Sequence, residues 1–278
     1  MSSDSTISRV LAQSGLVPVD GQVLLAHMLS QNRAWLIAHG DEALTREQAD
    51  AFIALARRRR NGEPVAYLTG MREFWGLPLS VSPAVLIPRP ETETLVELAL
   101  ARLPETREVR VLDLGTGSGA IALAIAHDRP RARILAVDVS DDALSVAREN
   151  ARRLDIANVE FARSDWYDNV GSTWRGAPFD VVASNPPYVA AADPHLAEGD
   201  VRFEPALALT PGGDGLDAIR CIVAGARQRL VPGGLLVVEH GYDQADAARK
   251  LFAAAGFTNL IAARDLAGTP RVVAGTAS

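Results

Sequence analysis

The feature that most limits how this chain can fold is an alternation of strand-like and helix-like runs that begins near residue 107. The β-branched run EVRVLDLG (108–115) precedes the apolar run AIALAIAH (120–127), and RILAVDV (133–139) precedes the amphipathic run DDALSVARENARRL (141–154). The alternation continues with strand candidates at 159–165, 179–185, 234–241 and 271–275 and helical runs at 216–230 and 244–255. Parallel strands joined through right-handed helical crossovers form a sheet covered on both faces. The sequence therefore predicts an α/β domain with a doubly wound, mainly parallel sheet.

The first 70 residues have a different pattern, in which helices are expected without strands. VLLAHML (23–29) and AFIALARRRR (51–60) carry apolar residues three and four positions apart, as amphipathic helices do. The segment Thr45–Gln48 reads TREQ and predicts a capping box at the start of the second helix. Gly62 and Pro64 then end that helix. We expect a small helical domain at the N-terminus.

A short connecting segment separates the two patterns. REFWGLPLSVSP (72–83) has two extended runs around Gly76–Pro78, which predicts a β-hairpin. IPRPETE (87–93) follows, with two prolines that stiffen the chain and glutamates at the start of a new helix. The predicted organisation is a helical domain over 1–71, a hairpin linker over 72–92 and an α/β domain over 93–278.

Composition argues against several classes of protein. The 278 residues carry a net charge of −6 with a pI near 5.4, so a broad basic surface for nucleic acid is not expected. The single cysteine, Cys221, cannot form an internal disulfide, and the polar N-terminus lacks a signal-peptide pattern. No apolar run approaches the length of a membrane span. These features predict a cytoplasmic protein without membrane contact, and nothing in them requires more than a monomer.

Two groups of side chains suggest ligands less strongly. Arg57–Arg60 invites an RNA-binding interpretation, yet residues 1–63 hold seven Lys or Arg and seven Asp or Glu. A solvated helix end, favoured by the helix dipole, is the preferred interpretation, and an electrostatic contact with a protein substrate is the alternative. The five histidines show no ligand spacing and the chain has one cysteine, so no metal site is expected.

A glycine-rich loop is the first candidate ligand site. DLGTGSGAIAL (113–123) joins a strand to a helix, and its glycines let the backbone turn tightly and lie against a ligand at the carboxyl edge of the sheet. Asp138 ends the next strand, 19 residues after Gly119, where a carboxylate can accept hydrogen bonds from both ribose hydroxyls. The residues expected to bind the cofactor are Gly115, Thr116, Gly117, Ser118, Gly119 and Asp138.

The glycine spacing distinguishes between two cofactors. A dinucleotide loop of a dehydrogenase reads G-x-G-x-x-G, whereas this loop reads G-x-G-x-G. S-adenosylmethionine has a ribose but no phosphate, and so fits better. A turn whose glycines bind nothing is the alternative that Asp138 opposes. SDW (164–166) ends the third strand, where Asp165 is expected to accept from an adenine amino group and Trp166 to cover the adenine ring, unless Trp166 is an ordinary core residue.

The second candidate site is SNPPYVA (184–190), which follows the fourth strand. With a methyl donor in the glycine loop, Asn185 is expected to lie near the methyl group and to touch both donor and acceptor. The Asn185 side-chain oxygen and the Pro186 carbonyl are two acceptors for the protons of an NH₂ group. Pro187 helps to hold that carbonyl in place, and Tyr188 supplies a flat face for a planar acceptor. The alternative is a proline turn with a buried tyrosine.

This arrangement suits methyl transfer to a planar nitrogen. The lone pair of an amide nitrogen is delocalised, and hydrogen bonds that orient the nitrogen and stabilise its growing positive charge favour the transfer. No general base is evident, so the proton is expected to leave to water after the methyl group arrives. In RFEP (202–205), Glu204 and Pro205 either line the acceptor pocket or brace the loop after Tyr188.

Together these residues resemble the class I S-adenosylmethionine-dependent methyltransferases that modify planar nitrogens. The resemblance is closest to the glutamine N5-methyltransferases of peptide chain release factors (the PrmC or HemK family), and it covers nearly the whole chain. Its most specific segments are PRPETE (88–93) and RFEP, since NPPY is shared with adenine and guanine methyltransferases. LDLGTGSGAIAL, GGDGL and PGGLLVVEHG also match.

The resemblance implies a Rossmann-like catalytic domain, a hairpin linker and an N-terminal helical domain that recognises the release factor. It implies that S-adenosylmethionine is held by Gly115–Gly119, Asp138, Trp166 and Asn185, and that Asn185–Tyr188 bind the glutamine of a Gly-Gly-Gln loop. Four alternatives remain: adenine-N6 methylation of DNA or RNA, glutamine methylation of a ribosomal protein, a non-catalytic binding partner and a dehydrogenase. The acidic composition opposes the first, and intact glycine and NPPY segments oppose the third.

Overall fold

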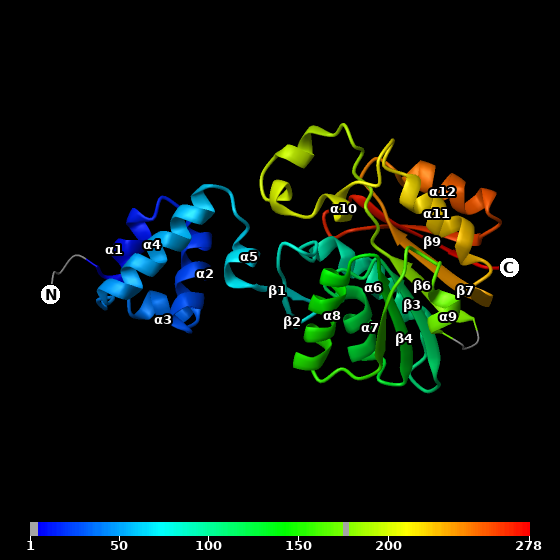
Figure 1. Cartoon of the computed structure of the whole chain (residues 1–278), viewed down its shortest axis with the longest axis horizontal. Coiled ribbons are helices and arrows are strands. Elements are labelled where there is room, and N and C mark those ends of the chain that lie inside the picture. The colour runs from blue at the N-terminus through cyan, green and yellow to red at the C-terminus, as the bar shows by residue number, and fades with distance from the viewer. Residues whose placement is uncertain (1–4, 175–177) are drawn as a thin grey trace. The chain divides into compact units, whose positions relative to one another are not determined.

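The computed structural model describes residues 5–174 and 178–278, and the chain forms two compact units (Figure 1). The first unit holds the described residues up to Met71 together with Ala197–Phe203. The second holds Arg72–Leu196 and Glu204–Ser278, apart from the residues outside the description. The predicted boundaries 1–71, 72–92 and 93–278 do not include the return of residues 197–203 to the first unit.

The first unit is helical, as predicted. Its helices are α1 (Ile7–Gln13), α2 (Pro18–Leu29), α3 (Arg33–Ala38), α4 (Arg46–Arg60) and α5 (Val65–Thr69). They pack around a small core of buried side chains that includes Ile7, Leu24, Leu25, Leu36 and Phe52. The capping box at the start of α4 is confirmed, because Thr45 Oγ1 accepts from the Gln48 amide at 3.1 Å and Gln48 Oε1 accepts from the Thr45 amide at 2.9 Å.

The predicted β-hairpin is also confirmed. Strands β1 (Met71–Phe74) and β2 (Leu77–Ser80) pair in a two-stranded sheet. Their turn residues, Trp75 and Gly76, both have positive φ, at 55° and 72°. Two such residues form the primed turn whose twist matches paired strands. A 3₁₀ turn, η1 (Pro90–Thr92), then leads into helix α6 (Glu93–Arg102), where the glutamates were expected to begin a helix.

The second unit is built on the predicted doubly wound sheet. Its strands are β3 (Val109–Leu114), β4 (Ala132–Asp138), β5 (Val159–Arg163), β6 (Phe179–Ser184), β7 (Leu230–Glu239), β8 (Thr258–Arg264) and β9 (Pro270–Thr276). They lie in the order β5-β4-β3-β6-β7-β9-β8, and only β9 runs antiparallel to its neighbours. Strand β8 was not predicted. It lies at the edge and is largely exposed, so it lacks the apolar run that marks a buried strand.

Helices cover both faces of this sheet (Figure 1). They are α7 (Ala120–Asp128), α8 (Asp141–Arg153), α9 (Val170–Thr173), α11 (Asp217–Ala226) and α12 (Ala245–Ala254), with a short α10 (Ala206–Leu209) and 3₁₀ turns at 194–197 and 201–203. Neighbouring strand residues enter opposite cores. Val111 packs with α6 and α7, whereas Leu112 packs with α11 and α12. The continuous apolar runs of the central strands follow from this double coverage.

The point where the strand order reverses positions the site. β3 pairs with β4 on one side and with β6 on the other, and Leu114 lies opposite Ser184 in the β3–β6 register. The Ser184 hydroxyl donates to the Leu114 carbonyl at 2.8 Å. The glycine loop and the NPPY segment therefore leave the sheet at the same level, at the carboxyl edge where doubly wound sheets bind ligands.

Candidate active site

A cavity of about 440 Å³ lies at this edge of the second unit. The predicted site residues that line it are Gly115, Thr116, Gly117, Ser118, Asp138, Trp166, Asn185 and Pro187. Gly119, Pro186 and Tyr188 do not line it. The structure thus brings the glycine loop, the ends of β4 and β5 and the start of NPPY around one space.

The glycine loop has the conformation that only glycine adopts easily. Gly115, Gly117 and Gly119 have φ values of 70°, 56° and 86°. A Cβ added at Gly117 would meet no atom within 4 Å, so the backbone there faces open space that a ligand can approach closely. At Gly119 a Cβ would lie 3.0 Å from the Leu123 side chain and 3.3 Å from Ala147. Gly119 is therefore needed for packing of α7, whereas Gly117 faces the cavity.

A buried carboxyl group supports the loop from beneath. The Thr116 hydroxyl donates to Asp113 Oδ2 at 2.7 Å, so this hydroxyl is committed to the loop. Asp113 is fully buried at the end of β3. Burial raises the pKa of Asp113 to about 7, against the lowering effect of its hydrogen bonds. Asp113 was not predicted as a site residue. Its position just before the glycine loop, at the end of a buried strand, was the signal that could have identified it.

Asp138 holds the loop and faces the cavity. Its Oδ2 accepts from the Gly117 amide and its Oδ1 from the Ser140 amide, each at 2.9 Å. Burial raises the pKa of Asp138, partly offset by these backbone bonds. Each carboxylate oxygen keeps a further acceptor position. The geometry fits the predicted hydrogen bonds to ribose hydroxyls.

Trp166 lies between the cavity and the core. It lines the cavity, is half-buried, and also packs against the apolar cluster beneath α11. Its φ of 43° is unusual for a bulky residue, and the Ser164 hydroxyl holds the turn by donating to the Trp166 carbonyl at 2.9 Å. Asp165 beside it is exposed and also lines the cavity. This placement suits a ring that covers one face of a bound adenine.

The NPPY segment places Asn185 at the wall of the cavity. Asn185 Nδ2 donates to Thr92 Oγ1 at 3.0 Å. Asn185 Oδ1 is buried, and among the described residues it accepts no hydrogen bond. A buried acceptor without a partner costs roughly 1–3 kcal/mol. An unpaired acceptor on a residue that lines the same cavity as the glycine loop points to a ligand that donates a hydrogen bond to this oxygen.

Tyr188 differs from the prediction. Its hydroxyl donates to Glu239 Oε1 at 3.1 Å, and its side chain does not line the cavity, so it offers the acceptor no flat face there. Burial raises the pKa of the phenol. The Tyr188 carbonyl accepts from Gln244 Nε2 at 3.0 Å. Tyr188 therefore anchors the end of NPPY to β7 and to the loop before α12.

Two buried residues that were not predicted as site residues, Thr92 and Glu239, connect Asn185 and Tyr188. The Thr92 hydroxyl donates to Glu239 Oε2 at 2.7 Å, and both residues are buried. Burial raises the pKa of Glu239 to about 7, although the Thr92 and Tyr188 hydrogen bonds lower it. A glutamate that ends the apolar run GLLVVEHG was the available signal, because it lies at the same sheet edge as Asn185.

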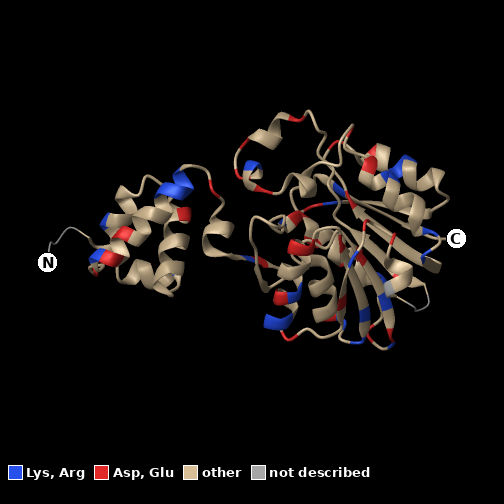
Figure 2. Cartoon of the chain, in the orientation of Figure 1, with Lys and Arg blue, Asp and Glu red and all other residues tan. Residues whose placement is uncertain are grey.

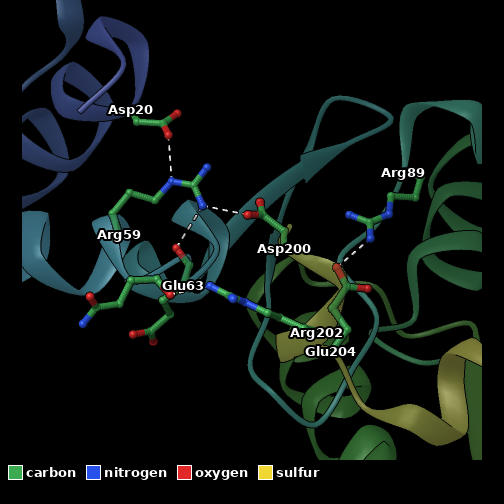
Figure 3. A network of polar contacts seen from close by, with 8 residues as sticks. Asp20, Arg59, Glu63, Arg89, Asp200, Arg202 and Glu204 are labelled. Atoms are coloured by element: carbon green, nitrogen blue, oxygen red, sulfur yellow. Dashed lines mark hydrogen bonds and ion pairs between the residues drawn. The ribbon is translucent and has the colours of Figure 1, made fainter. Parts of the chain in front are cut away.

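In the RFEP segment, one residue lines the pocket and the other braces the loop, so each predicted role belongs to a different residue. Pro205 lines the cavity, beside Leu207. Arg89 Nη2 donates to Glu204 Oε1 at 2.6 Å, and the Glu204 side chain is buried (Figure 3). Pro205 therefore contributes to the pocket, whereas Glu204 braces the loop that follows NPPY against the segment before α6.

Two arginines of the Arg57–Arg60 run form ion pairs, which the interpretation as a solvated helix end did not include. In the first unit, Arg59 donates to Asp20 and to Asp200, each at 2.7 Å (Figure 3). Arg58 pairs with Glu63. Figure 2 shows acidic residues interspersed with basic ones on these helices. The arginines at 58 and 59 thus serve internal ion pairs, and Arg59 helps to seat residues 197–203.

Across residues 5–174 and 178–278, no helix is long and apolar enough to cross a lipid bilayer. The same part of the chain holds no cluster of three or more His, Cys, Asp or Glu side chains arranged to bind a metal ion.

Comparison with known proteins agrees with this geometry. Residues 5–70 match the family described as PrmC N-terminal domain, and residues 105–257 match the family described as methyltransferase domain. A 16S rRNA N2 G1207 methyltransferase of T. thermophilus, solved with AdoMet and guanosine, superposes with a TM-score of 0.53 at 19% identity, over 75% of this chain and 50% of that one. A methyltransferase of Pyrococcus furiosus gives 0.53 at 16% identity, over 79% and 96%. These two likenesses show the fold alone.

Closer relatives identify the family. The release factor glutamine methyltransferase of Xylella fastidiosa (strain 9a5c) is 52% identical over 257 residues, which are 92% of this chain and 92% of the relative. The protein of the same name from Burkholderia pseudomallei is 51% identical over 278 residues, or 98% and 96% of the two chains. With 98% of this chain aligned to the second relative, the similarity extends through both units. The chain belongs to the family of release factor glutamine methyltransferases.

Proposed function

We propose that this protein transfers a methyl group from S-adenosylmethionine to the side-chain amide nitrogen of a glutamine in peptide chain release factors. The observation that carries the proposal is that Asn185 lines the cavity while its buried Oδ1 lacks a partner among the described residues. An NH₂ group of an incoming carboxamide supplies the missing donor. The family relationship supports a release factor as the source of that carboxamide.

The cavity residues fit the cofactor. Gly115 and Gly117 leave room for close approach of the backbone, Asp138 has acceptor positions for ribose hydroxyls, and Trp166 offers its ring for the adenine. When bound, S-adenosylmethionine supplies an electrophilic methyl group on a sulfonium. Because the loop lacks the spacing for a pyrophosphate, a nicotinamide dinucleotide fits it less well.

The roles of NPPY follow from the chemistry of an amide nitrogen. Its lone pair is delocalised into the carbonyl, so the nitrogen is a weak nucleophile. Asn185 Oδ1 and the Pro186 carbonyl are proposed to accept its two protons, which orients the nitrogen and stabilises the positive charge that develops on it. Each preorganised contact of this kind contributes a factor of about 10²–10³ in rate. Asn185 cannot take up a proton at neutral pH, and the proton is released to water after transfer.

The finer parts of the proposal concern partners. The first unit is proposed to recognise the release factor, and the glutamine is proposed to be that of the Gly-Gly-Gln loop. The protein is proposed to act in the cytoplasm as a monomer without direct contact to nucleic acid. A net charge of −6 and interspersed charges support the last point (Figure 2).

One assay tests the proposal directly. The protein is incubated with radiolabelled S-adenosylmethionine and either a purified release factor or nucleic acid. Label is expected on the factor, at a glutamine located by peptide mass spectrometry. Label on nucleic acid alone would overturn the proposal.

A variant tests the role of Asn185. Asn185→Ala is expected to lower transfer by about 10² or more, with cofactor affinity largely kept. Gln228→Ala removes an exposed carboxamide elsewhere in the second unit and is expected to leave activity unchanged. Substantial activity in Asn185→Ala contradicts the assigned role.

A further inference from the structure

We propose that Thr92 and Glu239 form a hydrogen-bond relay that holds the Asn185 carboxamide with its oxygen toward the acceptor, which makes both of them positioning residues for methyl transfer. This inference rests on the proposed function, because it concerns the orientation of the residue assigned to bind the acceptor nitrogen. It adds two residues from distant parts of the chain to the machinery of the reaction.

The relay consists of short contacts between buried groups. Glu239 Oε2 accepts from the Thr92 hydroxyl at 2.7 Å, and Thr92 Oγ1 accepts from Asn185 Nδ2 at 3.0 Å. Glu239 is 1% exposed and Thr92 is 4% exposed. Thr92 also lines the cavity beside Asn185, whereas Glu239 lies behind it. Water therefore competes little for these hydrogen bonds. Whether each group in the relay donates or accepts is set by the group next to it.

The direction of the relay follows from the number of protons. A carboxylate at Glu239 only accepts, so the single hydroxyl proton of Thr92 points to it. The Thr92 oxygen can then only accept from Asn185, which requires the NH₂ end of the carboxamide. The Asn185 oxygen is left without a partner among the described residues, as observed.

The reverse orientation would disable the site. It would place the Asn185 NH₂ group toward the acceptor NH₂, so that two donors faced each other, and would leave the Thr92 oxygen facing the Asn185 oxygen. The relay therefore selects an acceptor that donates hydrogen bonds. The relay thereby gives a function to the buried glutamate at the end of β7.

Glu239 also holds the other end of NPPY. Its second oxygen accepts from the Tyr188 hydroxyl at 3.1 Å. Arg271 on β9 favours the charged form of Glu239, whereas Glu91 on η1 opposes it. A protonated Glu239 can donate to Thr92, and the direction of the relay is then no longer imposed. Since burial places the pKa of Glu239 at about 7, activity is expected to rise with pH through this region.

The test replaces the hydroxyl of Thr92 and then restores it. Thr92→Val keeps the shape of the side chain, and its kcat is expected to fall by about 10² because the carboxamide is no longer oriented. Thr92→Ser restores the hydroxyl and is expected to retain kcat within about threefold. Cofactor affinity, measured by calorimetry, is expected to change less than about threefold in both variants, which a general loss of folding would not allow.

A second measurement does not depend on the folding of Thr92→Val. Glu239→Gln keeps the shape but removes the titrating group, so the rise in kcat through about pH 7 is expected in the native protein and absent in the variant. A native kcat in Thr92→Val, or an unchanged pH profile in Glu239→Gln, would overturn the relay. These results are distinct from failure of the proposed function, which appears as an active Asn185→Ala or an unlabelled release factor.

Discussion

At the scale of single residues, the site depends on carboxyl groups that the fold buries wholly or in part. Asp138 and Glu239 end strands β4 and β7, and Asp113 is the next-to-last residue of β3, at the edge that carries the cavity. Burial raises the pKa of each. Each carboxyl is held by hydrogen bonds from the loops above, so the groups position the glycine loop and the NPPY segment. The free-energy cost of burying them is offset only while these bonds are made.

The role of Asp138 can be measured by cofactor binding. Asp138→Asn replaces a charged acceptor by an amide, and binding of S-adenosylmethionine is expected to weaken about 10- to 100-fold, as charged hydrogen bonds are worth about 1.5–3 kcal/mol. Asp142→Asn, at an exposed position at the start of α8, is the matched control and should bind normally. Equal affinities for the two variants by calorimetry would contradict the assignment.

The raised pKa of Glu239 predicts a pH-dependent stability. A carboxyl whose folded pKa is about 7, above its ordinary value of 4.5, adds most stability below pH 4.5 and loses it as pH rises through 7. Glu239→Gln has no such group. The native free energy of unfolding, relative to that of the variant, is therefore expected to fall by on the order of 3 kcal/mol between about pH 4.5 and 7. Urea unfolding at several pH values checks this, and a constant difference refutes it.

At the scale of elements, strand pairing decides which loops meet. The β3–β6 register places the glycine loop beside NPPY, and β7, next to β6, brings Glu239 under the same segment. The loop Gly212–Gly215 completes the packing. Gly215 has a φ of 81°, and a Cβ there would lie 2.4 Å from the Tyr188 carbonyl oxygen. The GGDGL segment is therefore shaped to let NPPY pass close to it.

This contact gives a prediction with a control in the same loop. Gly215→Ala is expected to displace the Tyr188 carbonyl and to lower kcat and stability, the latter by about 2–4 kcal/mol from strain and overpacking together. Gly212 has a φ of 96° but open space around its Cβ position, so Gly212→Ala carries only the backbone strain of about 1–2 kcal/mol. Thermal unfolding and turnover of the two variants separate the effects. Equal losses would show that the contact with Tyr188 does not matter.

At the scale of the whole molecule, the chain leaves the second unit shortly after NPPY and returns to it at Glu204. Residues 197–203 are part of the first unit, where Asp200 accepts from Arg59. The Arg202 guanidinium donates to the Asn61 carbonyl in the same unit. One continuous loop therefore carries the acceptor segment of one unit and a structural piece of the other.

Removing the ion pair should loosen this loop. Arg59→Gln is expected to destabilise the first unit by about 1–3 kcal/mol, because it leaves Asp20 and Asp200 without their partner, and to speed protease cleavage within 190–203. Arg57→Gln, at an exposed position on the same helix, is expected to change stability by less than about 0.5 kcal/mol. Limited proteolysis of both variants provides the measurement. Identical cleavage rates would show that Arg59 does not hold the segment.

The sequence by itself determined the parts of this protein that depend on neighbours a few residues away. Period and β-branching predicted the helices and the buried strands, Thr45 and Gln48 predicted the capping box, and the glycines predicted the turn after β3. NPPY was predicted at a strand end because it follows a continuous apolar run. These features follow from backbone hydrogen bonds and side-chain spacing, which act over one or two turns of chain.

The tertiary structure alone decided which distant groups meet. Thr92 contacts Asn185 across 93 positions and Glu239 across 147. The same packing turned Tyr188 toward Glu239 instead of the cavity and returned residues 197–203 to the helical unit. No local pattern encodes such contacts, because they depend on strand order and on the balance between burying a polar group and giving it a partner. That balance exists only once the sheet has assembled.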